Sequence, residues 1–244
     1  GRSANSINKA LRTALAEFLE RHSLYSWKKE DIQFATFNEL NKTHKAIDPT
    51  TLVYSAKTPQ RTLTKDTTLG WVQGRDEKGS SVHIPAQLVY LFHEKVFPKE
   101  PRVFDQVTTN GSAAGTTYEE AAYRAACEAV ERDSFLLFWL HNISPPRIRL
   151  SSIKDHSTKN IINDIKNYNL DLYLLNITTD LEIPAFAAFI LDKHGETAVA
   201  FDTAAGRDVS ETVNKLLLST LELLQHKPPK PDINFIERVL SGKA

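Results

Sequence analysis

A long segment between Thr117 and His141 places the strongest constraint on how this chain can fold. No Gly or Pro interrupts it, and Pro145 and Pro146 follow shortly after, so a helix can continue to that point and is then stopped. Small apolar residues recur on one face at helical spacing: Ala121, Ala122, Ala125, Ala126, Ala129 and Val130. The pattern predicts a helix over about 117–141 with a small apolar face.

Hydrophobic periodicity predicts the other elements. The expected helices lie at 3–24, 157–168 and 210–226. The expected strands lie at 172–177, 185–191 and 197–201, with a hairpin of strands 70–74 and 81–84 around the turn 76–79. Residues 25–66 lack a sustained period and are interpreted as connecting structure, with one short strand at 51–54.

Three successive strands with helices before and after them favour an α+β fold, in which a mixed β-sheet has helices packed on one face. We expect a core domain over 1–226, followed by a Pro-containing C-terminal segment over 227–244.

Composition excludes several classes of function. Lys and Arg number 30 and so do Asp and Glu, so the net charge is zero and neither nucleic acid nor an acidic membrane is an expected partner. No apolar run reaches the roughly 18 residues of a membrane span. Cys127 is the single cysteine, and no signal peptide opens the chain, so a cytoplasmic location is expected. The chain contains no Met and begins at Gly1, which suggests an incomplete record.

Two of the predicted helices carry the same charged signature, Glu-x-x-Glu-Arg. It occurs at 17–21 and at 128–132, and the segments 14–23 and 125–134 are identical at five of ten positions, which indicates an internal repeat. In the first copy Thr13, Glu17 and Glu20 share one helical face, with Arg21 at its edge. In the second copy the face contains Glu120, Arg124, Glu128 and Glu131, with Arg132 beside it.

If these two helices pack side by side, several carboxylates converge and need cations among them. Carboxylate oxygens select Mg²⁺, and the interleaved Arg side chains suit phosphate. The alternative is a solvated helix face with ordinary ion pairs. The loop 109–115 feeds directly into the second helix and could bring its backbone to a phosphate; it lacks the P-loop pattern, so a simple capping turn is the alternative.

These segments resemble a known family. Thr109-Asn-Gly-Ser-Ala-Ala-Gly-Thr-Thr-Tyr-Glu-Glu-Ala-Ala, followed by Cys-Glu128-Ala-Val-Glu131-Arg132-Asp, is similar to the second ATP-binding motif of the YcaO superfamily. The segment from Thr13 to Arg21 resembles its first motif, and the helix 218–225 resembles a later Glu-x-x-Gln helix. The resemblance spans about 1–226.

The resemblance implies an enzyme that uses ATP and Mg²⁺ to activate a peptide backbone amide, closing Cys, Ser or Thr onto the preceding carbonyl to give thiazoline or oxazoline. The implied ATP site lies between the two motif helices. The implied metal ligands are Glu17, Glu20, Glu120, Glu128 and Glu131. The same five residues, with Arg2, Thr13, Thr116 and Arg132, are the implied nucleotide ligands, and Arg132 and Arg21 are the catalytic candidates.

Several alternatives stay open within this resemblance. Residues 131–139 favour the azoline-forming branch, while thioamidation or assistance in modifying a ribosomal protein are alternatives; a non-catalytic peptide-binding scaffold is another. The implied partners are a peptide substrate and a leader-peptide-binding protein or domain, and a homodimer is an option. Thr116 stands where Asn is common, and the upstream strands and Pro-rich terminus of ring-forming members do not occur here. We therefore do not expect these residues alone to be a complete catalyst.

Overall fold

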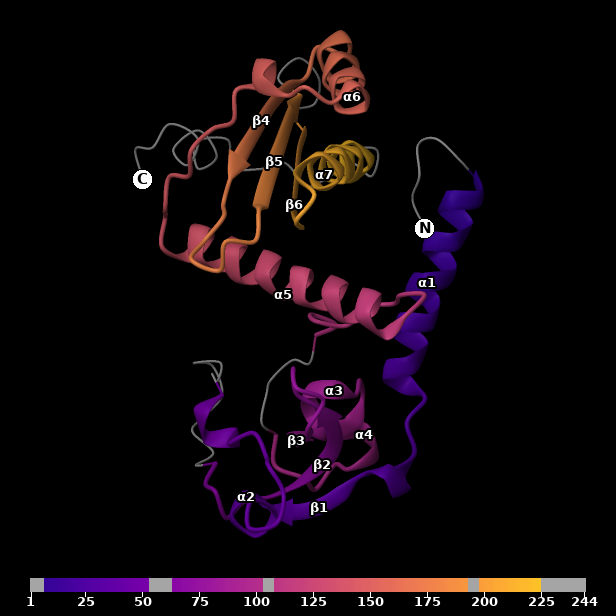
Figure 1. Ribbon diagram of the computed structural model, residues 1–244, viewed down its shortest axis with the longest axis vertical. Helices are drawn as coiled ribbons and strands as arrows, with labels where there is room; N and C mark the ends of the chain where they lie inside the picture. Colours follow the sequence, from indigo (N-terminus) through magenta and orange to yellow (C-terminus); the bar gives the residue numbers. More distant parts are fainter. Residues whose placement is uncertain (1–6, 53–62, 103–107, 193–197, 225–244) are drawn as a thin grey trace. The chain divides into compact units, whose positions relative to one another are not determined.

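A computed structural model describes residues 7–52, 63–102, 108–192 and 198–224 (Figure 1). It groups into two compact units, one formed by 1–17 with 110–244 and the other by 18–109. The α-helices are α1 (Ile7–Tyr25), α2 (Phe37–Leu40), α3 (Ala86–Val89), α4 (His93–Val96), α5 (Tyr118–Leu140), α6 (His156–Asn167) and α7 (Val209–Leu224). The short 3-10 helices are η1 (Lys29–Asp31), η2 (Pro49–Thr51) and η3 (Leu150–Ser152). The strands are β1 (Gln33–Thr36), β2 (Thr68–Arg75), β3 (Ser81–Pro85), β4 (Asp171–Asn176), β5 (Ala185–Asp192) and β6 (Ala198–Ala205).

The unit of residues 18–109 contains an antiparallel sheet with strand order β1-β2-β3. The predicted hairpin is confirmed, and Asp76 closes its turn by accepting hydrogen bonds from the backbone N–H groups of Lys78 and Ser80 at 3.0 and 2.9 Å. Gly79 has φ of 77°, a left-handed conformation that glycine adopts without strain. A small core forms around the buried Trp71.

The second sheet, with strand order β4-β5-β6, corrects the predicted mixed sheet. Both of its strand pairings are antiparallel, as are those of the first sheet. The physical reason is the length of the connections: 177–184 and 193–197 are too short for the crossover of a dozen or more residues that a parallel pair requires. The α+β class itself is confirmed.

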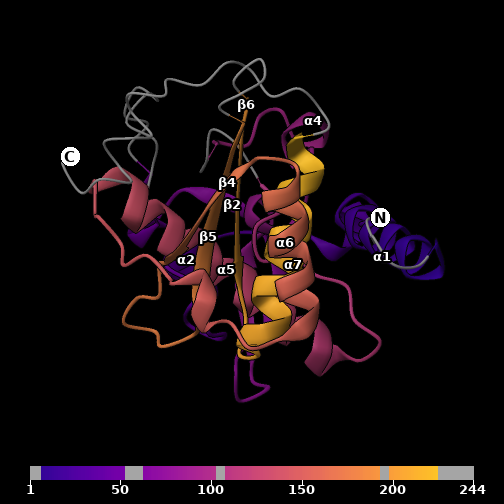
Figure 2. The same cartoon turned by 90° about the horizontal axis from the view of Figure 1, so that it is seen from above.

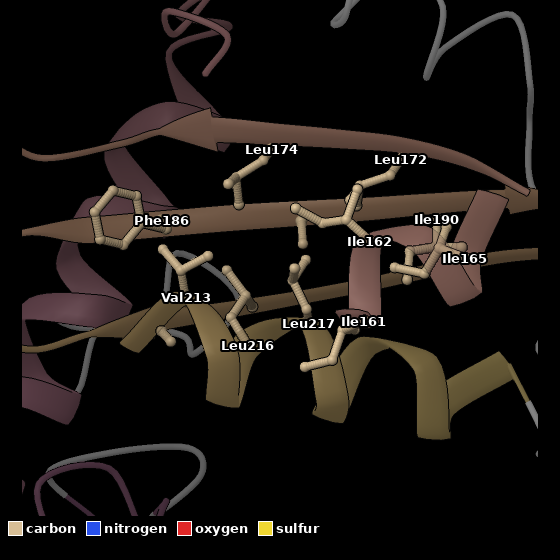
Figure 3. Packing of buried hydrophobic residues seen from close by; sticks show 12 residues of the cluster. Ile161, Ile162, Ile165, Leu172, Leu174, Phe186, Ile190, Val213, Leu216 and Leu217 are labelled. Atoms are coloured by element: carbon tan, nitrogen blue, oxygen red, sulfur yellow. The ribbon is translucent and has the colours of Figure 1, made fainter. Parts of the chain in front are cut away.

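Helices cover both faces of this second sheet, whereas helices on one face were predicted. Successive side chains of β5 point to opposite faces, and Phe186, Ala188 and Ile190 join α6 and α7 in one core. Figure 2 shows α6 and α7 together on one side of the sheet, and Figure 3 shows Leu216 and Leu217 of α7 directed at the strands. Ala185, Ala187, Phe189 and Leu191 form the other core with Phe138 of α5.

Most predicted helices and strands are confirmed, and most of the errors lie in the segment 25–66. The segment 25–66 contains β1 and α2, which the prediction missed. The short strand predicted at 51–54 is wrong at Thr51, which ends a 3-10 helix, and 53–54 lie outside the described residues. The third predicted strand ends four residues later than expected, at Ala205. The predicted domain boundary at 226/227 also lies outside the described residues.

The described helices were also compared with the requirements of a membrane span. None of them combines the necessary length with sufficient apolar character.

Candidate nucleotide and metal site

The N-terminus of α5 is closed by three polar side chains. Thr117 is the N-cap and accepts a hydrogen bond from the backbone N–H of Glu120 at 3.2 Å. Thr116 donates from its backbone N–H and its hydroxyl to Oε2 of Glu120, at 2.8 and 2.6 Å. Arg124 donates to Oε1 of the same carboxylate at 2.6 Å. These hydrogen bonds, chiefly those from Thr116, lower the pKa of Glu120, so its carboxylate is held ionised at the start of the helix.

Two turns further along α5, Glu128 and Glu131 lie on either side of one guanidinium. Nη2 of Arg132 is 3.9 Å from Oε1 of Glu128 and 3.9 Å from Oε1 of Glu131. The Arg132 side chain is 44% exposed, while those of Glu128 and Glu131 are 28% and 15% exposed. The two carboxylates therefore lie progressively deeper along the helix, with a solvent-facing cation between them.

Glu131 is the most buried of the three carboxylates Glu120, Glu128 and Glu131. Burial raises the pKa of Glu131, and a hydrogen bond from the Thr203 hydroxyl to its Oε1, at 2.7 Å, offsets part of this effect. The charges of Arg132 and of Lys215 on α7 favour the ionised form, whereas Asp202 opposes it. A bound cation would favour the ionised carboxylate further.

The loop before α5 lies against the same helix. The backbone N–H of Gly111 points to Oε2 of Glu128 at 3.3 Å, and Gly111 has φ of 80°. At Gly115 a Cβ atom would lie 2.5 Å from the backbone N of Ala121 and 2.9 Å from the carbonyl O of Thr117. The loop therefore runs along the helix from Glu128 back to the first turn of α5. Position 115 must be glycine because the loop backbone lies so close to the helix there.

Gly115→Ala is expected to lower the free energy of unfolding by about 2 kcal/mol, because the clash is with backbone atoms that cannot rotate away. It should also weaken nucleotide binding by displacing the loop from Glu128. Urea unfolding and nucleotide titration measure the two effects. Gly79→Ala is the control, because nothing lies within 4 Å of that position and only backbone strain is added. Unchanged nucleotide affinity in Gly115→Ala would contradict a role for the loop.

The first-motif residues lie on α1. Thr13, Glu17 and Arg21 are exposed there and Glu20 is partly buried, and all four take part in interactions. The division between the two units falls directly after Glu17, so Glu17 groups with the unit of α5 and Glu20 with the other. The convergence of carboxylates from both helices therefore stays a prediction. Arg2 lies outside the described residues.

Sequence reasoning missed Thr203, the residue that binds Glu131. The predicted strand ended at Phe201, whereas β6 continues to Ala205 and so includes Thr203. One signal was present in the sequence. Thr203 is the polar residue in a row of alternate positions that otherwise holds Val199, Phe201 and Ala205. Cys127, the single cysteine, is buried on α5.

The donor set of α5 fits a magnesium-bound triphosphate. Its carboxylate oxygens are the hard ligands that Mg²⁺ prefers, and Arg132 offers a guanidinium suited to phosphate oxygens. Within the described ranges no three His, Cys, Asp or Glu side chains are grouped closely enough to hold a metal by themselves. Mg²⁺ in nucleotide sites commonly keeps water and phosphate oxygens as ligands, so an all-protein cage is not required.

Comparison with known proteins assigns the class and then the family. A family model described as YcaO cyclodehydratase, ATP- and Mg²⁺-binding, matches residues 3–226, which places the chain in an ATP- and Mg²⁺-binding class. The chain belongs to the YcaO family, which confirms the resemblance stated from the sequence motifs.

Individual relatives agree with this assignment. An uncharacterized protein from the tfuA 3′ region of Rhizobium leguminosarum bv. trifolii is 39% identical over 127 residues, which are 50% of this chain and 29% of the relative. A heterocyclase solved in complex with substrate and cofactor matches with a TM-score of 0.74 and 25% identity, over 89% of this chain and 32% of that one. YcaO from Methanopyrus kandleri, bound with AMPPCP and Mg²⁺, matches with a TM-score of 0.58 and 21% identity, over 91% of this chain and 54% of that one. This chain thus spans between about a third and a half of the length of these relatives.

Proposed function

We propose that the protein uses ATP and Mg²⁺ to activate a peptide backbone amide, and that it closes Cys, Ser or Thr side chains into thiazoline or oxazoline rings. The observation that carries the proposal is the half-buried carboxylate pair of α5, Glu128 and Glu131, with Arg132 between them and the Gly111 backbone beside them. Membership of the YcaO family supports it, as does the likeness to a heterocyclase solved with substrate and cofactor.

In this proposal Glu128 and Glu131 hold the metal, together with Glu120 and, from α1, Glu17 and Glu20. Mg²⁺, when bound, neutralises the charge of the triphosphate and so favours phosphoryl transfer. Arg132 and Arg21 contact the phosphate oxygens, and Thr13, Thr116 and Arg2 complete the nucleotide contacts. In this structure Thr116 donates two hydrogen bonds to Glu120. Thr116 would therefore act on the nucleotide either through the Glu120 carboxylate or directly, after those hydrogen bonds are broken.

The proposed reaction consumes one ATP for each ring and releases ADP and phosphate. The substrate side chain attacks the carbonyl carbon of the preceding residue, and its proton is lost. The carbonyl oxygen then takes the γ-phosphoryl group of ATP and ADP leaves. Phosphate departs with that oxygen, the amide nitrogen loses its proton, and a C=N double bond forms within the ring that the attack has closed. The protein contributes position and charge neutralisation, which are the principal requirements of phosphoryl transfer.

Incubating the full-length protein with ATP, Mg²⁺ and a Cys- and Ser-rich peptide that carries a leader segment tests the proposal. We expect one ADP, one phosphate and the mass loss of one water for each ring formed, measured by mass spectrometry and phosphate release. The control peptide has Ala in place of Cys, Ser and Thr. In a parallel incubation that also contains sulfide, exchange of oxygen for sulfur would instead indicate thioamidation, and peptide binding without ATP turnover would indicate a scaffold. Either result would reject ring formation. The leader-binding partner, the homodimer and the cytoplasmic location stay predictions.

A further inference from the structure

On the sheet face that packs against α5, the residues of β5 and β6 are apolar except at one position of β6. The residues of β5 on this face are Ala and the larger Phe189 and Leu191, and those of β6 include Phe201 and Ala205. Thr203 lies between these last two and is 7% exposed. A buried hydroxyl without a hydrogen-bond partner is costly, so a Thr in this row needs a polar group opposite it.

That polar group is the carboxylate of Glu131. The Thr203 hydroxyl donates to Oε1 of Glu131 at 2.7 Å across 72 residues of sequence. In the neighbouring strand Ala187 pairs with Thr203, and its small side chain leaves room for the carboxylate. The carboxylate thus accepts a hydrogen bond from the polar residue of an otherwise apolar row of β6.

Contacts on both sides of this hydrogen bond fix how α5 lies on β6. Toward the C-terminus of α5, the rings of Phe135 and Phe201 pack with their centroids 5.4 Å apart. Toward its N-terminus, the hydroxyl of Tyr123 accepts a hydrogen bond from the backbone N–H of Arg207 at 2.9 Å. The hydrogen bond from Thr203 lies between these two contacts, so helix and strand are held in one register and Glu131 has a defined position along it.

We propose that Thr203 is a positioning residue that orients the Glu131 carboxylate toward the metal-bound triphosphate. Among the described residues, the hydrogen bond from Thr203 and the ion pair with Arg132 both fall on Oε1 of Glu131. Oε2 would therefore be the oxygen offered to a bound cation. The inference rests on the proposed function, because it assigns a role within the same nucleotide site.

The test compares Thr203→Val, which removes the hydroxyl and keeps the shape, with Thr203→Ser, which keeps the hydroxyl. Thr220→Val is the matched control, because Thr220 is also buried in this unit and, among the described residues, its hydroxyl donates to the carbonyl O of Leu216 on its own helix, at 2.7 Å. The full-length protein is titrated with a non-hydrolysable ATP analogue at a series of Mg²⁺ concentrations. Urea unfolding of the ligand-free variants measures stability separately.

We expect Thr203→Val to raise the Mg²⁺ concentration at half-maximal nucleotide binding about tenfold, the size of effect found when a group that orients a metal ligand is removed. Thr203→Ser should restore most of the native affinity, and Thr220→Val should leave it unchanged. If Thr203→Val does not fold, Thr203→Ala takes its place. Equal Mg²⁺ requirements in Thr203→Val and Thr220→Val, with Glu131→Gln impaired, would overturn the positioning role alone. A native protein that binds no nucleotide would overturn the proposed function together with this inference.

Discussion

Glu128→Gln is expected to weaken the binding of Mg²⁺-ATP about 100-fold. Glutamine keeps the size of the side chain but removes the negative charge that would attract the cation. Removing a group that only orients a metal ligand lowers metal affinity about 10- to 100-fold. Removing a direct ligand should therefore lower it by about 100-fold or more. Isothermal titration with a non-hydrolysable ATP analogue in the presence of Mg²⁺ measures the effect.

The position of Glu128 explains why the loss should be specific. Its side chain is only 28% exposed, it accepts from Gly111 of the loop, and Arg132 is 3.9 Å away. Asp133→Asn provides the control, since Asp133 is an exposed carboxylate on the same helix, on the face away from Glu128 and Glu131. Equal affinities in the two variants would remove the acidic stripe of α5 from the nucleotide site.

Glu100→Ala is expected to cost about 3 kcal/mol of unfolding free energy. Glu100 belongs to the unit of residues 18–109. Glu100 and His93 form a buried hydrogen-bonded pair, with side chains 3% and 0% exposed, and Glu100 also accepts from the backbone N–H of Gly70 at 2.8 Å. Removing one member of such a pair leaves its partner buried without compensation. Nδ1 of His93 already has no hydrogen-bond partner in the described structure, so both ring nitrogens would be unsatisfied.

Acidification should weaken the stabilising contact between Glu100 and His93. Burial by itself would raise the pKa of Glu100, but hydrogen bonds from His93, Gly70 and Gln87 outweigh it and lower the pKa. A carboxylate whose pKa is lower in the folded state stabilises the fold above its unfolded pKa of about 4.3, and this contribution is lost as the pH falls through the folded value.

The stability difference between native protein and Glu100→Gln should therefore shrink on acidification. Thermal unfolding over a pH series measures it, with the exposed Glu77→Ala as the control that should change little. If Glu100→Ala and Glu77→Ala had the same free energy of unfolding, the pair of Glu100 and His93 would contribute nothing to stability.

Much of the fold was predictable because local patterns agree with the tertiary structure in the unit that contains α5. The helix predicted at 117–141 is α5, and those predicted at 157–168 and 210–226 correspond to α6 and α7. Prediction failed between 25 and 66, where β1 is only four residues long and its exposure pattern lacks alternation. A strand that short carries too little periodic signal and forms because β2 pairs with it.

The sequence by itself determined the family, the α+β class and the acidic stripe of α5, because helical spacing alone places Glu120, Glu128 and Glu131 on one face. Only the tertiary structure decided which of these carboxylates is buried and what holds it. Thr203 reaches Glu131 across 72 residues, a contact that depends on how α5 lies on β6. Periodicity records which way a side chain faces along its own element, whereas the partner it meets is set by the packing of two elements.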